Sequence, residues 1–386
     1  MHILHIPISL PLVERKSAGT YIVDLVRAQA SNNIDMEFGV LHVNPVRFID
    51  LLGSDNSRFI DVSSFSGLER LYIKNRYFFN RNKRRSKSWV RFCVSAFHDY
   101  SKKYGIPDLI HAHSGRGPGE IAAILKKEYG IPFVVQEHNP VFLYEDKLTE
   151  SECQRLRNVY DGANFICPVS ISMKSKISDL VDSGKIRVTP NVVSRKFFIK
   201  SKKIGVHRNF TIVSRLDLNK NVQMSVMAFY EATKENDSIY LNIYGQGSEL
   251  NGLQELINRL GINKKVNFMG NKDKAEIARA LTNSEGLLLS SYKETFGLPV
   301  LESLFCGCPV ISTKSGGPEE IADNVSGVHL VEVDDMNAMK IEIKRLIDCP
   351  ATSDERINFA SEAVKFYGEI ALVNMWFDIY KDAVKK

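Results

Sequence analysis

The sequence predicts an α/β protein built from two doubly wound parallel-sheet domains that face each other across a cleft. Short runs rich in β-branched residues alternate with longer stretches of helical periodicity, which is typical of parallel strands joined by crossover helices. This alternation occurs twice, and a polar, lysine-rich stretch at residues 200–208 separates the two series. A length of 386 residues suits two domains of ordinary size.

The first series begins with a buried strand predicted at residues 2–9. Apolar residues then recur at helical spacing from Tyr21 to Val26. Further strands are predicted at residues 36–43, 109–113, 133–136 and 165–169. We therefore expect an N-terminal domain over residues 1–195 and a linker over residues 196–208.

The second series is expected to form a C-terminal domain over residues 209–366. Helical patterns at residues 221–235 and 273–281 separate some of its strands. The predicted strands are residues 210–216, 239–244, 266–269, 287–290, 310–313 and 328–333. In sheets of this kind ligands bind beyond the carboxyl ends of the strands, so the residues that follow each strand are the candidates for function.

The composition indicates a globular protein of a reducing compartment. Apolar residues make up 44% and charged residues 25% of the chain, which excludes wholesale disorder. The six cysteines form no CxxC pair and no zinc spacing. The first ten residues lack a basic region and a small-residue cleavage site, and no apolar run reaches the roughly 20 residues of a membrane span. We expect a cytoplasmic protein, with a peripheral position at the inner face of the plasma membrane as a further option.

The net charge of +6 is concentrated in one segment. Residues 70–97 contain no Asp or Glu but carry nine basic side chains among several aromatic ones, so the remainder of the chain is slightly acidic. We interpret the segment as an insertion that docks to an anionic membrane surface or lipid acceptor. A solvated helix face and a nucleic-acid site are the alternatives, and no nucleic-acid-binding motif supports the latter. The nine residues are Arg70, Lys74, Arg76, Arg81, Lys83, Arg84, Arg85, Lys87 and Arg91.

The strongest functional motif lies within residues 290–320, where a predicted strand ends in a polar turn that leads into a helix. Gly297 lets the backbone approach a ligand closely, and Leu298 begins the helix with a proline next to it. The free N–H groups of such a helix start suit a diphosphate. A carboxylate at Glu302 could accept hydrogen bonds from a ribose diol. Taken alone, Glu294 and Glu302 would be two surface carboxylates.

The spacing of this motif carries a resemblance to a known family. Seven residues separate Glu294 from Glu302 and include FGLP, while GCPVI follows at residues 307–311 and SGGPEE at residues 315–320. This pattern resembles glycosyltransferase family 4, whose members are retaining enzymes of the GT-B fold. The resemblance implies a catalytic position for Glu294, which would bind sugar hydroxyls. It also implies donor contacts from Glu294, Phe296, Gly297, Leu298 and Glu302.

A second motif, SRLDLNKN, ends the strand predicted at residues 210–216. A planar guanidinium at Arg215 and an ammonium at Lys220 suit a pyrophosphate, and the corresponding residues of the family hold the donor diphosphate. Two solvated surface cations are the alternative. Gly245 and Gly247 resemble the family's G-x-G loop near the nucleotide, although the same residues are also typical of a simple tight turn.

Histidines and a glutamate end strands of the first series. His113 resembles the histidine that the family places near the transferred sugar, and a buried core histidine is the alternative. A metal shared with His111 would need more ligands, and His138 is the one further candidate by position, so we expect no metal site. Glu137 and His138 are acceptor-side candidates by resemblance, or plain loop residues. Gly19 is expected to keep the donor-binding role of the family's glycine pair.

The resemblance implies a retaining hexosyltransferase that moves a sugar from a nucleoside-diphosphate donor to a glycan or lipid-linked acceptor in bacterial surface polysaccharide assembly. UDP is the expected nucleotide because it is common in the family. No DxD pair ends a predicted strand, so Arg215, Lys220 and the helix start would stabilise the leaving group without a metal or other cofactor. A GT-B epimerase or hydrolase acting on nucleotide sugars remains the alternative. The fold also implies that a C-terminal helix at residues 367–386 crosses back to the first domain.

Overall fold

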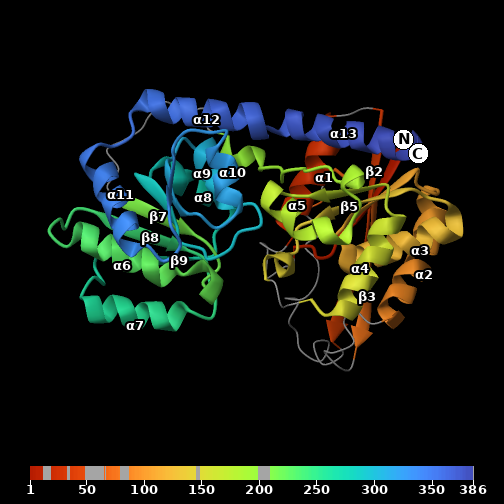
Figure 1. The fold of residues 1–386 in the computed structure, drawn as a ribbon, viewed down its shortest axis with the longest axis horizontal. Helices are drawn as coiled ribbons and strands as arrows, with labels where there is room; N and C mark the ends of the chain where they lie inside the picture. Colours follow the sequence, from red (N-terminus) through yellow and green to blue (C-terminus); the bar gives the residue numbers. More distant parts are fainter. Residues whose placement is uncertain are drawn as a thin grey trace. The chain divides into compact units, whose positions relative to one another are not determined.

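The computed structural model describes residues 1–11, 19–32, 35–47, 65, 67–78, 87–144, 148–198 and 209–385. The chain forms two compact units (Figure 1). Unit 1 comprises Met1–Val192 and Ile370–Lys386, and unit 2 comprises Val193–Glu369. Each unit contains one six-stranded parallel sheet, which confirms the predicted α/β class of two doubly wound sheets.

The sheet of unit 1 has the strand order β3-β2-β1-β4-β5-β6, and every neighbouring pair is parallel. The order reverses between β1 and β4, which makes the carboxyl ends of these two strands a topological switch point. The strands are β1 (His2–Ile6), β2 (Glu37–Arg47), β3 (Arg70–Phe78), β4 (Leu109–His113), β5 (Phe133–Glu137) and β6 (Phe165–Pro168).

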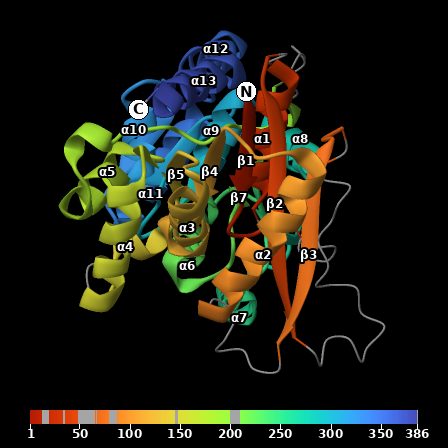
Figure 2. The same cartoon turned by 90° about the vertical axis from the view of Figure 1, so that its right-hand side faces the viewer.

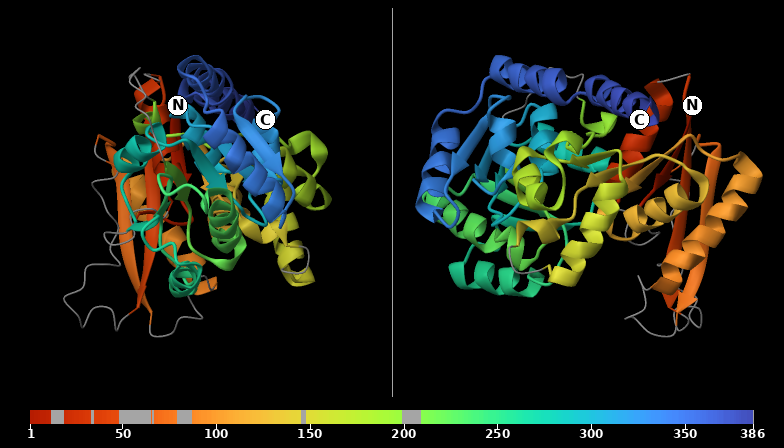
Figure 3. Two further views of the ribbon diagram at one scale, coloured as in Figure 1. Left: turned by 90° about the vertical axis from the view of Figure 1, so that its left-hand side faces the viewer. Right: turned by 45° about the vertical axis from the view of Figure 1, so that its right-hand side comes forward.

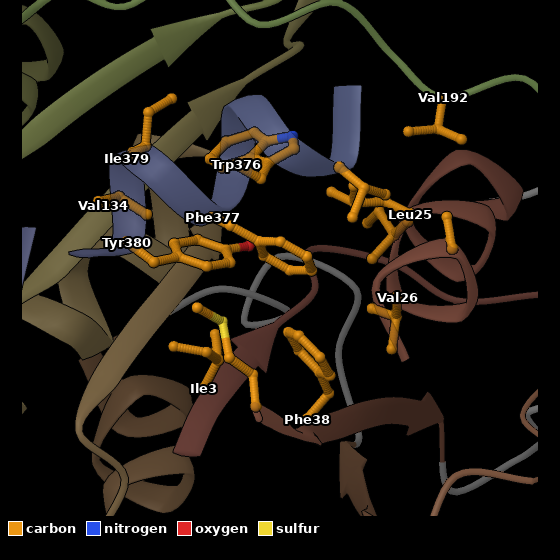
Figure 4. Packing of buried hydrophobic residues seen from close by; sticks show 14 of the residues in the cluster. Ile3, Leu25, Val26, Phe38, Val134, Val192, Trp376, Phe377, Ile379 and Tyr380 are labelled. Atoms are coloured by element: carbon orange, nitrogen blue, oxygen red, sulfur yellow. The ribbon is translucent and has the colours of Figure 1, made fainter. Parts of the chain in front are cut away.

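Helices cover both faces of this sheet, so its central strands are fully buried. Their apolar residues are interrupted by histidines in β1 and β4 and by the polar end of β5. On one face, α1 (Thr20–Asn32) and α13 (Glu369–Lys385) pack against the strands. Figure 4 shows Trp376 and Tyr380 of α13 above Ile3 of β1. The opposite side carries α2 (Lys87–Tyr104), α3 (Glu120–Tyr129) and α4 (Glu150–Gly162) (Figure 2), and α5 (Ile171–Ile177) follows β6.

One structural prediction was wrong. We treated residues 70–97 as an insertion, but residues 70–78 form the edge strand β3, which pairs in parallel with β2 from Gly39↔Arg70 to Arg47↔Phe78. Residues 87–104 form α2. The basic residues made this stretch look unlike a strand. An edge strand tolerates basic side chains that a central strand excludes. Four of the nine basic residues, Arg81, Lys83, Arg84 and Arg85, lie outside the described residues.

The sheet of unit 2 has the order β12-β11-β10-β7-β8-β9 and its switch point lies between β7 and β10. Its strands are β7 (Asn209–Val213), β8 (Tyr240–Tyr244), β9 (Val266–Gly270), β10 (Gly286–Leu289), β11 (Val310–Thr313) and β12 (Val328–Val331). Its helices are α6 (Val222–Thr233), α7 (Leu250–Leu260), α8 (Lys274–Thr282), α9 (Leu298–Phe305), α10 (Gly317–Ala322), α11 (Met336–Asp348) and α12 (Ser353–Tyr367).

One core of unit 2 lies between the sheet and helices α6, α7 and α11. Figure 3 shows the ribbon from two further sides. The predicted helix over residues 367–386 is divided at Gly368, where α12 of unit 2 ends and α13 of unit 1 follows. No helix in the described part of the chain is long and apolar enough to span a bilayer.

Candidate functional site

The two strongest motifs meet at the switch point of unit 2. The SRLDLNKN stretch follows β7, and the residues from Ser290 to Gly297 follow β10, the neighbouring strand. Lys220 and Glu294 form an ion pair with 2.5 Å between Nζ and Oε1. Their side chains are 18% and 9% exposed, so the pair is largely removed from water. The structure therefore brings together two residues that are 74 positions apart in sequence and that we assigned to one site.

Hydrogen bonds tie the two loops of this pair to each other. Asn219 donates its side-chain N–H to Lys293 O at 2.9 Å, and the Tyr292 amide donates to Asn219 O at 2.8 Å. Ser290 Oγ donates to Asn221 O at 2.8 Å. Short side chains and backbone groups thus hold together the two loops that carry Lys220 and Glu294.

Glu294 is held on three sides. Ser291 Oγ donates to Glu294 Oε1 at 2.7 Å, and the Glu294 amide donates to Ser315 O at 2.8 Å. Gly317, from the SGGPEE motif, packs so tightly that a Cβ there would lie 2.1 Å from Phe296 O. The two motifs that carried the resemblance are thus one packed unit, and the Glu294 carboxylate has little freedom to move.

The start of α9 follows this carboxylate. Gly297 precedes the helix with φ 92°, a left-handed conformation that favours glycine, and no side chain caps the first turn. Leu298 and Glu302 are half-buried on the helix. The side chain of Phe296 is buried, and its ring centroid lies 6.1 Å from that of Tyr367. Phe296 therefore packs beneath the loop. Pro299 has no N–H, and the Val300 amide donates to Gly297 O at 2.9 Å. The N–H of Leu298 is thus the group of this helix start that can serve an anion.

The glycines after β8 press against the loop that carries Arg215. A Cβ at Gly245 would lie 1.8 Å from Ser214 O, and one at Gly247 would lie 2.0 Å from Leu216 O. The Leu216 amide donates to Gln246 O at 3.0 Å. Only glycine allows this approach, so both residues fix the backbone of the Arg215 loop whether or not they also contact a ligand.

Arg215 itself is the most exposed charge of the site. Its side chain is 69% exposed and forms an ion pair with Asp217, two residues further on. Asp217 was not among the residues that the sequence singled out. It stands inside the SRLDLNKN motif, but only Arg215 and Lys220 of that motif were assigned a contact.

In unit 1, His113 lies at the end of β4 and is fully buried. Its Nε2 lies 3.0 Å from His5 Nδ1, and the two rings stack. His111 Nδ1 contacts the Tyr380 hydroxyl at 2.7 Å, and Gln29 donates to the same hydroxyl. Burial lowers the pKa of all three imidazoles, to about 3 for His5, so the cluster is neutral at physiological pH.

The three histidines bring ligand nitrogens within 4.8 Å of one another. His5 is the third member that sequence reasoning missed, although its place opposite His111 on the neighbouring strand is a signal that a strand alignment could have supplied. The rings of His111 and His113 stack at 4.2 Å with an interplanar angle of 18°. The His5 ring is tilted by 39° to that of His111.

Glu137 ends β5, one residue after Gln136, which pairs with His113 in the sheet register, and its carboxylate is fully buried. It accepts hydrogen bonds from the Gly115 amide at 2.8 Å, the Tyr160 hydroxyl at 3.0 Å and the Asn139 amide at 3.0 Å. Burial raises the pKa of this carboxyl, although the hydrogen bonds oppose that shift. The carboxylate oxygens of Glu137 accept hydrogen bonds from within the protein, and in this way Glu137 joins two loops.

His138 is half-buried beside the glutamate, and its ring centroid lies 4.5 Å from that of Tyr21. Burial lowers the pKa of His138 to about 3. Gly19 precedes α1 with φ 66°, and a Cβ there would lie 2.3 Å from Ser9 O. Gly19 is therefore required for the close passage of the β1 loop over the start of α1.

Among the basic side chains of the 70–97 segment that the structure describes, Arg70 and Lys74 are engaged in ion pairs. Arg70 contacts Glu37 at 2.8 Å, and Lys74 contacts Asp99 at 2.7 Å. Lys74 also lies 5.8 Å from the ring centroid of Phe92. These pairs reduce the positive charge that β3 and α2 present to solvent.

Comparisons with known proteins match both halves of the chain to glycosyltransferase families. A family model described as "Glycosyl transferases group 1" matches residues 194–365, and one described as "Glycosyltransferase Family 4" matches residues 18–197. The probable sucrose-phosphate synthase of Thermosipho melanesiensis is 26% identical over 281 residues, which is 65% of this chain and 65% of that relative.

Solved structures share the fold over nearly the whole chain. The sucrose-phosphate synthase of Thermosynechococcus elongatus matches with a TM-score of 0.77 and 19% identity, covering 99% of this chain and 98% of the other. The crystal structure of Anabaena Alr3699/HepE in complex with UDP-glucose matches with a TM-score of 0.73 and 16% identity, covering 98% and 99%.

Proposed function

The chain belongs to glycosyltransferase family 4, and on that premise we propose that it transfers a sugar from a nucleoside-diphosphate donor, with retention, to a hydroxyl of a glycan or lipid-linked acceptor. The observation that carries the proposal is the Lys220–Glu294 pair beside the uncapped start of α9 at the switch point of unit 2. A cation and a positive helix end suit the diphosphate of such a donor, and the carboxylate suits the hydroxyls of its sugar.

Unit 2 would hold the donor. Arg215 and Lys220 would contact the diphosphate, and the N–H at the start of α9 would donate a hydrogen bond to one of its oxygens. Glu294 would bind hydroxyls of the sugar, and Glu302 the ribose. A relative solved with UDP-glucose supports a uridine donor. In unit 1, neutral His113 and the loop that Glu137 orders would serve the sugar and the acceptor.

The proposed reaction balances without a covalent enzyme intermediate. The acceptor oxygen forms a bond to the anomeric carbon on the face that the diphosphate leaves, and the bond between that carbon and the phosphate oxygen breaks. The acceptor proton passes to the departing phosphate. Arg215, Lys220 and the helix start stabilise the charge that develops on the diphosphate, which is the largest electrostatic task of the step. These cations make a divalent metal unnecessary in the proposal.

A thermal-shift screen against UDP-, GDP- and ADP-sugars tests the donor. A ligand at about 100 times its Kd should stabilise the protein by roughly 2.7 kcal/mol. The donor identified in this way is then labelled in its sugar and incubated with and without acceptors. Free sugar or an epimer formed without acceptor would indicate hydrolysis or epimerisation and would contradict the transferase assignment of the donor site. Full transfer in excess chelator is expected, and loss of activity there would contradict the metal-free step.

We further propose that the basic segment brings the enzyme to an anionic membrane that carries a lipid-linked acceptor. The segment has nine basic residues and no acidic one, which supports this proposal. Because Arg70 and Lys74 are engaged in ion pairs, the proposal relies mainly on the basic residues that follow β3 in the sequence. Synthesis of a bacterial surface polysaccharide would fit an enzyme that meets its acceptor at a membrane.

A further inference from the structure

We propose that Asp217 competes with the nucleoside diphosphate for Arg215. This competition would weaken binding of the nucleoside-diphosphate product and so favour its release. The inference rests on the proposed function, because it assigns a role within the same donor site. It concerns the pair formed by an exposed guanidinium and the carboxylate two residues further along the loop after β7.

The two cations of the site are paired very differently. Lys220 contacts a carboxylate that is 9% exposed and is itself fixed by Ser291. Arg215 is 69% exposed, and its partner Asp217 is 23% exposed. An exposed guanidinium can turn from Asp217 to a phosphate without disturbing the core, so the Arg215–Asp217 pair is the one that a diphosphate can exchange.

The side chain of Asp217 has no evident structural task besides this pair. It precedes the short 3₁₀ helix Leu218–Lys220 but does not cap it, and its Oδ1 is buried without a hydrogen-bond partner among the described residues. The backbone of the loop is fixed from elsewhere, because Gly247 packs against Leu216 O and the Glu249 amide donates to the same oxygen at 3.0 Å. Removal of the charge should therefore leave the loop in place.

The competition acts more strongly on the product than on the donor. In a nucleotide sugar both phosphates are diesters with one negative charge each, whereas the terminal phosphate of the product is a monoester with about −1.5 to −2 charges at neutral pH. A carboxylate beside the diphosphate therefore repels the product more than the donor. Arg215 would return to Asp217 as the product leaves.

The test compares Asp217→Asn with wild-type protein in titrations with UDP and with UDP-glucose, followed by calorimetry. We expect Asp217→Asn to bind UDP about tenfold more tightly, equivalent to roughly 1.4 kcal/mol, and UDP-glucose only a few-fold more tightly. Asp237→Asn is the matched control, since it removes one carboxylate from unit 2 at the opposite edge of the sheet. The Asp237 side chain is 95% exposed and pairs with Lys265.

The outcomes distinguish failure of this inference from failure of the proposed glycosyltransferase function. If the wild-type protein binds no nucleoside diphosphate of uridine, guanosine or adenosine, both the proposed function and the inference are wrong. If it binds one and Asp217→Asn binds that ligand equally or more weakly, Asp217 merely orients Arg215 and the inference alone fails. Equal tightening of product and donor would also overturn it. In an Arg215→Gln background the competition for Arg215 is gone and only the direct repulsion remains, so Asp217→Asn should tighten UDP binding by clearly less than about tenfold.

Discussion

Lys220 Nζ lies 2.5 Å from Glu294 Oε1, and the hydroxyl of Ser291 shares the same carboxylate oxygen at 2.7 Å. The ammonium thus faces a carboxylate that cannot turn away from it. When one partner of such a sheltered pair is removed, the other is left without its counter-charge in a site with little water. The pair therefore links the stability of the two loops to the chemistry that we propose for them.

Lys220→Ala should lower turnover by roughly 10²- to 10³-fold, the usual loss when one group that stabilises developing charge is removed. Steady-state transfer of labelled sugar measures this effect. Lys272→Ala is a suitable control, because Lys272 is a partly exposed lysine of the same unit paired with Glu276. Wild-type turnover by Lys220→Ala would refute the phosphate assignment.

Gly247→Ala should weaken nucleotide binding while the unit stays folded. The new Cβ would lie 2.0 Å from Leu216 O, so the loop that carries Arg215 must move. A loss of at least tenfold in affinity for the donor is expected, because misplacement of a binding group by about 1 Å can cost 10²-fold in rate. Calorimetric titration with the nucleotide measures it.

Gly252→Ala supplies the comparison for the glycine experiment. Gly252 lies inside α7, and nothing lies within 4 Å of a Cβ built there. Alanine in a helix interior is favoured over glycine by about 0.5–1 kcal/mol, so this variant should be slightly more stable and bind the nucleotide normally. Unchanged binding by Gly247→Ala would show that the loop adapts and that the glycine is not required for the site.

The donor motifs could be predicted from sequence because each is a local pattern at the end of a strand. Lys220 and Glu294 could be recognised from the spacing of residues within their own loops. The parallel sheet places these two loops side by side. His5 and Asp217 could not be found in this way. His5 joins the histidine cluster because it pairs with His111 on the neighbouring strand. Asp217 joins the site because the Arg215 side chain turns towards it. Strand β3 was not predicted because an edge strand lacks the apolar run by which the central strands were recognised.

The buried imidazoles of unit 1 should make the protein sensitive to acid. The pKa of His5 is about 3 in the folded protein and about 6.5 in an unfolded chain. The unfolded state therefore binds more protons below pH 6.5, and stability falls as the pH decreases from 6.5 towards 3. The loss is about 1.4 kcal/mol per pH unit for His5, or roughly 2 kcal/mol at pH 5. His111 and His113 act in the same direction.

Urea unfolding at pH 7.5 and pH 5 measures this effect through tryptophan fluorescence. The chain has two tryptophans, Trp89 and Trp376, and both belong to unit 1. In His5→Asn the difference in unfolding free energy between the two pH values should shrink by about 2 kcal/mol. His98→Asn alters an exposed histidine of the same unit and should leave the difference unchanged. An unaltered pH dependence in His5→Asn would contradict a neutral, buried His5.

Reversal of the charges at Arg81, Lys83, Arg84 and Arg85 should abolish binding to anionic liposomes and leave transfer to a water-soluble acceptor intact. Each basic residue near such a surface contributes about 1 kcal/mol, so four reversals outweigh the remaining attraction. A control variant reverses four exposed lysines of unit 1, Lys102, Lys103, Lys127 and Lys381, and changes the net charge equally. Flotation that is lost only in the first variant locates the docking surface in the basic segment. Equal loss in both would mean that net charge alone attracts the protein, and unchanged flotation in the first would exclude membrane docking by this segment.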